Sequence, residues 1–207
     1  MNPFRATKWT ARALGARWRA QRYLRFTQLC GIVPSDRIID VGAGAGLALA
    51  TFNRDNAITA VDLAPWPGFE TPANVTFVRG DGCALPFADG AFDVAFSNSV
   101  IEHVGPERQA DFAREIRRVA DAYFVQTPNR YFPVEPHYQF PLFQFLPIAA
   151  QRWLNGRFTL GWQQRGQWEP IRLLGRDDLQ RLFPDAEIHR EHLLGFTKSL
   201  MAVRRRS

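Results

Sequence analysis

The chain has 207 residues, of which 46% are hydrophobic, 22% charged and 13% aromatic. This composition predicts one well-packed domain over residues 1–207 and excludes disorder, collagen and coiled coil. Residues 1–37 carry eight cations against one acid, residues 38–120 six against eleven, and residues 121–207 twelve against eight. We therefore expect a basic helical segment over 1–36, an acidic middle and a basic C-terminal part.

The only two cysteines, Cys30 and Cys83, stand far apart and outside any metal-ligand spacing. Neither a disulfide framework nor a structural zinc site is expected, which favours a reducing, cytoplasmic compartment. No run of 18 apolar residues occurs, and residues 1–25 contain arginines throughout. We therefore expect neither a membrane span nor export.

Short runs rich in Val, Ile and Phe alternate with helix-length segments, which is typical of βαβ units and a largely parallel sheet. The predicted strands are Arg37–Val41, Ala57–Asp62, Val75–Arg79, Phe92–Ser97, Ala122–Gln126, Ala186–Leu193 and Thr197–Arg204. The last two should form a hairpin over Leu194, Gly195 and Phe196. Helices are predicted at Leu47–Asn53, Glu107–Ala120 and Gly175–Phe183 from apolar residues at helical spacing.

After the fifth strand the composition changes, with many prolines and aromatics and no clear period. Flexible linkers lack such bulk, so residues 127–170 are predicted to form an irregular, aromatic-rich insertion or lid.

A glycine-rich turn follows the first strand, in the run Asp40-Val41-Gly42-Ala43-Gly44-Ala45-Gly46. Glycines allow positive φ angles and close approach of a ligand to the backbone. Asp62 ends the second strand, where an acid can hold a ribose diol in a doubly wound fold. Asp40 can accept hydrogen bonds near a cationic or amino-bearing ligand. The pattern predicts a site for a nucleotide-like cofactor.

One alternative is an NAD(P)-dependent oxidoreductase, which shares this loop and the ribose acid. The dinucleotide fingerprint requires a glycine at its sixth position, where this chain has Leu47. A Walker loop is excluded because no Gly-Lys-Ser/Thr run follows.

Three further segments match one family in order and spacing: Asp62 with Leu63, then Gly80-Asp81-Gly82-Cys83-Ala84-Leu85-Pro86-Phe87, and Phe92 to Val104 with Ser97, Asn98 and the Glu102-His103 pair. Over residues 37–129 the sequence resembles the class I S-adenosylmethionine-dependent methyltransferases, in particular the type 11 group that is similar to ubiquinone and menaquinone methyltransferases. The resemblance implies a Rossmann-like α/β fold with a seven-stranded sheet, mostly parallel and antiparallel at its last strand.

The resemblance also implies S-adenosyl-L-methionine as the cofactor and methyl transfer as the reaction. Asp81 would meet the adenine amino group, and Gly82 or Cys83 would offer backbone contacts. The expected cofactor-binding residues are Asp40, Gly42, Ala43, Gly44, Gly46, Asp62, Leu63, Asp81, Gly82, Cys83, Ser97 and Asn98.

Methyl transfer from a sulfonium requires alignment of the acceptor and, for a hydroxyl, removal of a proton. His103 and His137 lie beyond strands four and five and titrate near neutrality, so they are the predicted proton acceptors. Some members of the resembled family hold a metal with a Glu-x-x-Glu-His run. Ser99 stands at the first of those positions here, so no metal is predicted.

The acceptor is predicted to be a small-molecule, lipid-like or glycoconjugate amphiphile, because aromatics and arginines mix in the insertion. Arg130, Tyr131 and Tyr138 are its expected contacts. Segment 140–154 and the basic N-terminal segment could rest on an anionic bilayer. The arginine-rich ends also suggest a non-enzymatic nucleic-acid-binding protein, but no nucleic-acid motif accompanies them, so no nucleic-acid partner is expected. The oligomeric state stays open.

Overall fold

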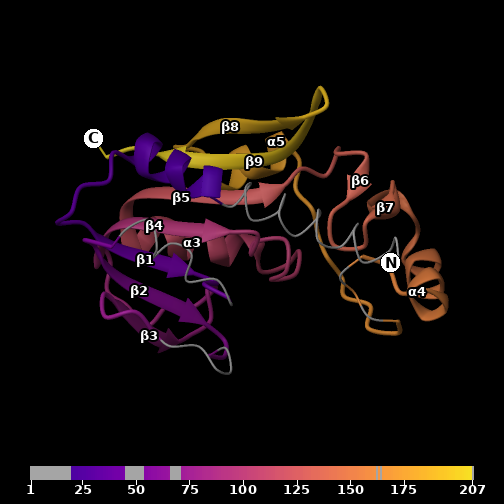
Figure 1. The fold of residues 1–207 in the computed structure, drawn as a ribbon, viewed down its shortest axis with the longest axis horizontal. Helices are drawn as coiled ribbons and strands as arrows, with labels where there is room; N and C mark the ends of the chain where they lie inside the picture. The colour runs from indigo at the N-terminus through magenta and orange to yellow at the C-terminus, as the bar shows by residue number, and fades with distance from the viewer. Residues whose placement is uncertain (1–19, 45–53, 66–70, 162, 164, 207) are drawn as a thin grey trace, which may run out of the picture.

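A computed structural model describes residues 20–44, 54–65, 71–161, 163 and 165–206. Its main feature is a seven-stranded sheet in the order β3-β2-β1-β4-β5-β9-β8 (Figure 1). Six strands are parallel and β9 runs antiparallel to both of its neighbours, as predicted. The strands are β1 Arg37–Val41, β2 Ala57–Asp62, β3 Val75–Arg79, β4 Phe92–Asn98, β5 Ala120–Pro128, β8 Glu187–Leu193 and β9 Phe196–Arg204.

Most predicted strand boundaries agree with the structure to within one residue, and β5 is the exception. It is two residues longer than predicted at each end, because β4 pairs with it from Ala120 and β9 pairs with it as far as Pro128. The hairpin between β8 and β9 also differs from the prediction, because β9 already begins at Phe196. Leu194 and Gly195 alone form its turn, both at positive φ, which suits a tight two-residue hairpin.

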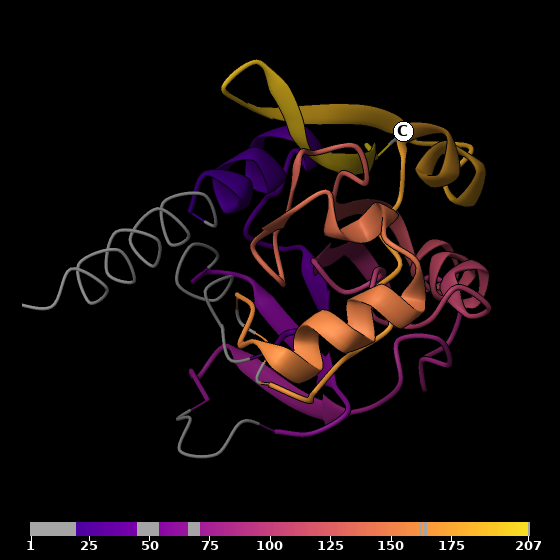
Figure 2. The same cartoon turned by 90° about the vertical axis from the view of Figure 1, so that its right-hand side faces the viewer.

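Helices cover both faces of the sheet (Figures 1 and 2). On one face, helical residues 20–30 pack Tyr23 and Phe26 against Phe96, with ring centroids 5.2 and 4.9 Å apart. On the other face, α3 (Gln109–Val119) and α5 (Arg176–Leu182) belong to a second cluster of buried side chains, in which Phe112 and Leu179 are fully buried. Neighbouring residues of a strand belong to different clusters, because successive side chains point to opposite faces of the sheet.

A buried ion pair fastens the helical residues 20–30 to the far edge of the sheet. Arg22 Nη2 lies 2.9 Å from Glu191 Oε2 on β8, and both side chains are at least nine-tenths buried. Arg22 Nη1 also donates hydrogen bonds to the side chains of Asn98 and Gln126, at 3.2 and 3.1 Å. This arginine therefore links the N-terminal helix to the ends of β4 and β5.

The segment after β5 is more regular than the sequence predicts. It forms a two-stranded hairpin of β6 (Val134–Glu135) and β7 (Phe140–Pro141), then the 3-10 turn η1 (Phe143–Phe145) and the helix α4 (Ile148–Arg157). We call residues 134–157 the β6–α4 insertion. In Figure 1 it lies at the end of the sheet towards which the parallel strands point. The prediction of an irregular segment was wrong for α4, because this helix buries only Asn155 and so has no apolar period to detect.

Two predictions fall outside the described residues, namely the helix at Leu47–Asn53 and the first part of the basic segment, residues 1–19. Within the described part of the chain, no helix combines the length and apolar character that crossing a membrane would require.

Candidate active site

The order of the strands places a crevice between β1 and β4. The chain moves outward from β1 through β2 to β3, and then returns to β4 on the other side of β1. Ligands of open α/β sheets bind at the carboxyl ends of the strands at such a reversal. A cavity of about 410 Å³ lies there, lined by Val41, Gly42, Val61, Asp62, Leu63, Gly80, Asp81, Gly82, Ser99, Val100, His103, Val104, Arg108 and Phe112.

Gly42 makes the tight turn that opens this cavity. Its φ of +75° is in the left-handed region, and its amide donates a 2.8 Å hydrogen bond to the carbonyl oxygen of Val61. A Cβ at this position would lie 2.3 Å from Val100 Cγ2. Gly42 therefore meets both a conformational and a steric requirement for glycine. Ala43 and Gly44 follow it outside the cavity lining, and Gly46 lies outside the described residues.

Asp62 ties the ends of β1 and β2 together at the cavity wall. Its Oδ2 accepts a hydrogen bond from the Gly44 amide at 2.8 Å, and its Oδ1 accepts one from the Leu63 amide at 2.7 Å. A carboxylate has about four acceptor positions, so each oxygen keeps capacity for a ligand hydroxyl. Leu63 is 66% exposed beside it and supplies an apolar edge.

Asp40 sits deeper than its neighbours in the glycine-rich run. Its side chain is buried and does not line the cavity. Burial, followed by the charge of Asp62, raises the pKa of Asp40 to about 7. A direct contact between Asp40 and a ligand stays a prediction.

The third motif supplies an ion pair to the cavity wall. Arg108 Nη2 lies 2.7 Å from Asp81 Oδ2, and the Cys83 amide donates to Asp81 Oδ1 at 2.9 Å. The Cys83 hydrogen bond and the guanidinium hold the pKa of Asp81 below its usual value. Sequence reasoning missed Arg108, because an arginine just ahead of a helix gives no signal of where it points.

Gly82 lines the cavity, whereas Cys83 is buried beneath it in the core. Burial raises the pKa of the Cys83 thiol to about 11. The thiol is therefore protonated near neutral pH and fills space in the core.

The predicted residues Ser97 and Asn98 on β4 make hydrogen bonds within the fold and do not line the cavity. The hydroxyl of the fully buried Ser97 donates a 2.9 Å hydrogen bond to the Val41 carbonyl oxygen, and Asn98 Oδ1 accepts one from Arg22. The next two residues, Ser99 and Val100, line the cavity and were not predicted. Ser99 has a φ of 57°, so the chain turns at this point, beyond what a strand pattern can show.

The two predicted proton acceptors lie against each other. His103 lines the cavity, and its ring centroid is 4.8 Å from that of His137, which stands between β6 and β7. His137 Nδ1 lies 2.7 Å from Glu135 Oε1, and its Nε2 faces Glu102 Oε1 at 4.0 Å. Thr127 donates to the other oxygen of Glu102, whereas the buried Oε1 has no hydrogen-bond partner.

The two histidines have opposite pKa shifts. Desolvation and the neighbouring His137 lower the pKa of His103. For His137, desolvation lowers the pKa, but the Glu135 hydrogen bond and the surrounding carboxylates outweigh it and raise the value overall. His103 is therefore neutral near pH 7 and able to accept a proton, beside a histidine that favours its charged form.

The three predicted acceptor contacts lie away from the cofactor cavity. Tyr138 is buried in the insertion, where its ring stacks 4.1 Å from that of Phe143. The guanidinium of Arg130 lies 6.0 Å from the centre of the Phe145 ring. Their roles as acceptor contacts stay predictions.

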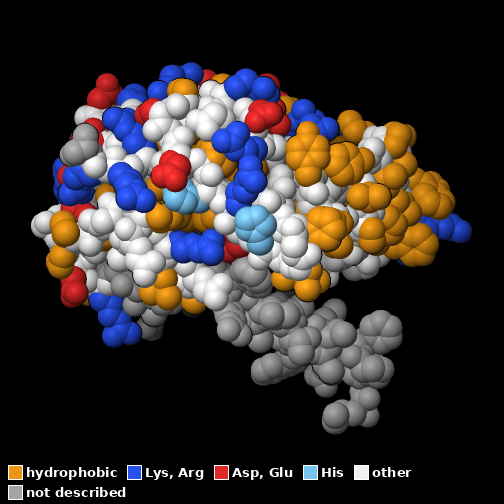
Figure 3. Space-filling model, turned by 90° about the horizontal axis from the view of Figure 1, so that it is seen from above, with side chains coloured by type: hydrophobic (Ala, Val, Ile, Leu, Met, Phe, Trp, Pro, Cys, Tyr) orange, Lys and Arg blue, Asp and Glu red, His pale blue; other side chains and the backbone are white. Residues whose placement is uncertain are grey.

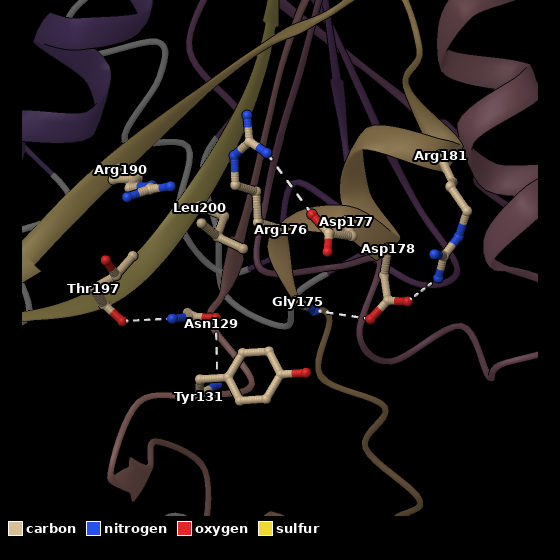
Figure 4. Close-up of a pocket in the computed structure, with 10 residues that line it drawn as sticks. All are labelled: Asn129, Tyr131, Gly175, Arg176, Asp177, Asp178, Arg181, Arg190, Thr197 and Leu200. Carbon is tan, nitrogen blue, oxygen red and sulfur yellow. Dashed lines mark hydrogen bonds and ion pairs between the residues drawn. The ribbon is translucent and has the colours of Figure 1, made fainter.

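Tyr131 lines a second cavity, of about 370 Å³, between α5 and the β8–β9 pair (Figure 4). Asn129 fixes its floor by donating to the Thr197 carbonyl oxygen at 2.8 Å. The acids of this cavity are already paired with arginines on the same helix, Asp178 with Arg181 and Asp177 with Arg176. None of its lining residues lines the cofactor cavity.

Comparison with known proteins agrees with this geometry. A family model described as a methyltransferase domain matches residues 39–122, the part of the chain that contains β1 to β4 and the cavity motifs. Residues 39–122 are therefore similar to a methyltransferase domain, as the sequence resemblance predicts, and the predicted α/β fold is confirmed.

Relatives and solved structures extend the comparison. An uncharacterized methyltransferase of Mycobacterium leprae (strain Br4923) is 42% identical over 82 residues, covering 36% of this chain and 30% of the relative. The 1,6-didemethyltoxoflavin-N1-methyltransferase of Burkholderia thailandensis has a TM-score of 0.60 at 15% identity, covering 100% of this chain and 92% of that one. The cyclase SpnF has a TM-score of 0.54 at 19% identity, covering 81% and 57%.

The sequence matches cover a minor part of the mycobacterial relatives, 28% to 30% of the relatives' own length. The likenesses to solved structures establish the fold, and a cyclase among them illustrates that this fold hosts more than one chemistry. Neither the oxidoreductase nor the nucleic-acid-binding alternative gains support from the comparisons.

Proposed function

We propose that this chain binds S-adenosyl-L-methionine in the cavity between β1 and β4 and transfers its methyl group to a small amphiphilic acceptor. The observation that carries the proposal is the convergence of all four sequence motifs on one cavity, whose lining also includes His103. Methyltransferases share this fold, and the match to a methyltransferase domain supports S-adenosyl-L-methionine as the cofactor.

The residues of the cavity fit such a cofactor. The volume of about 410 Å³ lies within the ~300–1,000 Å³ usual for small-molecule sites. Asp62 accepts hydrogen bonds from hydroxyl groups, and Asp81 accepts them from an amino group. Val41, Val61, Leu63 and Phe112 offer apolar surface for a flat ring. The cofactor supplies a methyl group on a positively charged sulfur.

His103 is the proposed proton acceptor when the acceptor is a hydroxyl. His103 would take up the hydroxyl proton as the acceptor oxygen received the methyl group, and the cofactor would supply that methyl group from its sulfonium and leave as the neutral thioether. The His137 ring packs against the His103 ring, and Glu135 contacts His137, so both act as positioning residues.

An amphiphilic acceptor is supported by the position of the β6–α4 insertion. His137 belongs to the hairpin of this insertion and contacts His103, so the insertion adjoins the cavity. The insertion exposes large apolar side chains near a polar reaction centre. The reaction is proposed for the cytoplasm, which the buried, unpaired Cys30 and Cys83 support.

The first test is calorimetry of the purified chain with S-adenosylhomocysteine, with NADH and NADPH as controls. Asp62→Ala should weaken binding of the homocysteine product by about 1–3 kcal/mol, since charge-assisted hydrogen bonds are lost. Asp89→Ala removes a carboxyl that is 82% exposed at a turn outside the cavity lining, and should leave the affinity unchanged. Dinucleotide binding, or equal effects of the two variants, would refute the assignment.

The role of His103 is tested by His103→Asn. This variant should keep its affinity for S-adenosylhomocysteine and lose turnover of a hydroxyl acceptor. The ligand atoms of Glu102, His103 and His137 all lie within 4.8 Å of one another, and these side-chain types can also bind a divalent metal. Turnover is therefore measured with EDTA and with added Mg²⁺, and loss of turnover in EDTA would contradict the prediction that no metal is required.

A further inference from the structure

Large apolar side chains are exposed together on the β6–α4 insertion. Trp153 is 64% exposed, Ile148 59%, Leu142 55%, Phe158 52% and Phe145 47%. The space-filling view in Figure 3 shows apolar side chains gathered at this end of the molecule, whereas charged side chains are spread over the other end. A contiguous exposed apolar patch of this kind marks an interaction surface in a folded protein.

Helix α4 does not bury its apolar side chains in the core. The one buried residue of α4 is Asn155, so the helix does not lay an apolar face on a core as α3 does. Trp153 and Ile148 are instead exposed. The helix that carries them lies in front of the sheet in Figure 2. The exposed surface therefore suits an apolar environment outside the chain.

The exposed charges of the insertion itself have one sign. Residues 136–168 contain Arg152, Arg157 and Arg165 and no aspartate or glutamate. Arg152 and Arg157 are exposed on α4, and the guanidinium of Arg152 lies 4.5 Å from the centre of the Trp168 ring. The one acid of the insertion, Glu135, is buried, so the insertion exposes only cations.

We propose that the β6–α4 insertion docks on the surface of an anionic lipid bilayer. Trp, Phe, Ile and Leu side chains enter the boundary between headgroups and acyl chains, and the flanking arginines contact the phosphates. Each arginine near such a surface strengthens binding roughly fivefold, from about 1 kcal/mol per charge. A second copy of the chain is the weaker occupant, because pairing two insertions would bring arginines together with no acid from 136–168 to match them.

Docking would place the cavity beside the bilayer. His137, within the hairpin of the insertion, contacts His103 at the cavity wall, so the apolar surface and the reaction centre are parts of one continuous structure. An amphiphilic acceptor could then be presented without leaving the membrane surface. The docking itself does not depend on methyl transfer and is measured without cofactor.

The experiment is co-sedimentation of the full chain with vesicles of phosphatidylcholine alone and of phosphatidylcholine with phosphatidylglycerol at equal parts. We expect at least tenfold stronger binding to the anionic vesicles, weakening as salt rises. Trp153→Ser and Arg157→Gln should each reduce binding severalfold. Leu194→Ser and Arg114→Gln are matched controls, because Leu194 is 89% exposed on the β8–β9 turn and the Arg114 side chain is 64% exposed on α3.

Several outcomes would overturn the proposal. They are no binding to anionic vesicles at low salt, equal losses in the insertion variants and the controls, and a dimer that light scattering detects and Trp153→Ser abolishes. The first outcome would mean that no surface of the chain binds anionic lipid. The second would mean that the overall basic charge alone causes binding, and the third would assign the patch to a second copy. Retained binding of S-adenosylhomocysteine by each variant separates loss of docking from loss of the fold and from failure of the proposed function.

Discussion

At the carboxyl edge of the sheet, short backbone hydrogen bonds and carboxylates fix one another, as in the bonds from Gly44 and Leu63 to Asp62. In the β6–α4 insertion, by contrast, large apolar side chains such as Trp153 are exposed. The first region has no space for a Cβ at Gly42, whereas the exposed side chains of the second have open space around them. Under the two proposals made above, the first region binds the cofactor and the second faces the acceptor and the bilayer.

The largest effect is expected from Gly42→Ala at the carboxyl edge. A positive φ costs a non-glycine residue about 1–2 kcal/mol, and the new Cβ would also meet Val100 at 2.3 Å. We expect at least tenfold weaker binding of S-adenosylhomocysteine, which is about 1.4 kcal/mol, together with a lower melting temperature. Calorimetry and thermal unfolding measure the two quantities.

Gly90→Ala provides the matched control for this substitution. Gly90 also has a positive φ, of 63°, but nothing lies within 4 Å of its absent Cβ, and it does not line the cavity. Gly90→Ala should lower the free energy of unfolding by a similar conformational cost. Its affinity for S-adenosylhomocysteine should stay within about twofold of that of the unmodified chain. Equal affinity losses in both variants would show that the cavity wall at Gly42 is less tightly packed than the structure indicates.

An intermediate effect is expected at the junction of the two regions, where His103 meets His137. The raised pKa of His137, which faces Glu135, Glu102 and Glu169, stabilises the fold below pH 6.5, and this contribution disappears as pH rises through the folded-state value. The lowered pKa of His103 acts in the opposite direction, because its contribution is present above pH 6.5 and is lost as pH falls.

Urea unfolding between pH 5 and 8 should therefore give opposite changes for two variants. Relative to the unmodified chain, His137→Asn should gain stability as pH rises, and His103→Asn should gain stability as pH falls. Each change is limited to about 1.4 kcal/mol per pH unit for one proton. Changes of the same sign in both variants would exclude the opposite protonation of the two rings.

The smallest effect is expected from Tyr138→Phe inside the insertion. The Tyr138 hydroxyl donates to the Glu169 carbonyl oxygen at 3.1 Å and accepts from the Glu169 amide at 3.0 Å. Its loss should cost about 0.5–1.5 kcal/mol of unfolding free energy and leave cofactor affinity unchanged. A fall in S-adenosylhomocysteine affinity as large as that of Gly42→Ala would show that the two regions are not independent.

The sequence predicted the carboxyl edge well because its signals are local. Strands such as Arg37–Val41 carry buried apolar residues between polar turns, Gly42 follows β1 directly and Asp62 ends β2, so topology brings these residues together. Arg108 and Ser99 were missed because their positions depend on how loops turn after the strands end. Helix α4 was missed because it buries only Asn155 and so has no apolar period, and the position of Tyr138 against Phe143 depends on tertiary packing that the sequence does not show.

The ion pair between Arg22 and Glu191 has a consequence for how the protein is made. The two residues are 169 positions apart in the chain. At roughly 5–20 residues per second, the ribosome needs about ten to thirty seconds to supply Glu191 after Arg22 has been synthesised. During that interval the N-terminal helix has an arginine without its anionic partner, and β5 lacks β9 along one edge. Until the β8–β9 hairpin emerges, the nascent chain therefore exposes the unpaired edge of β5, and ribosome-associated chaperones have their longest opportunity to bind at this edge.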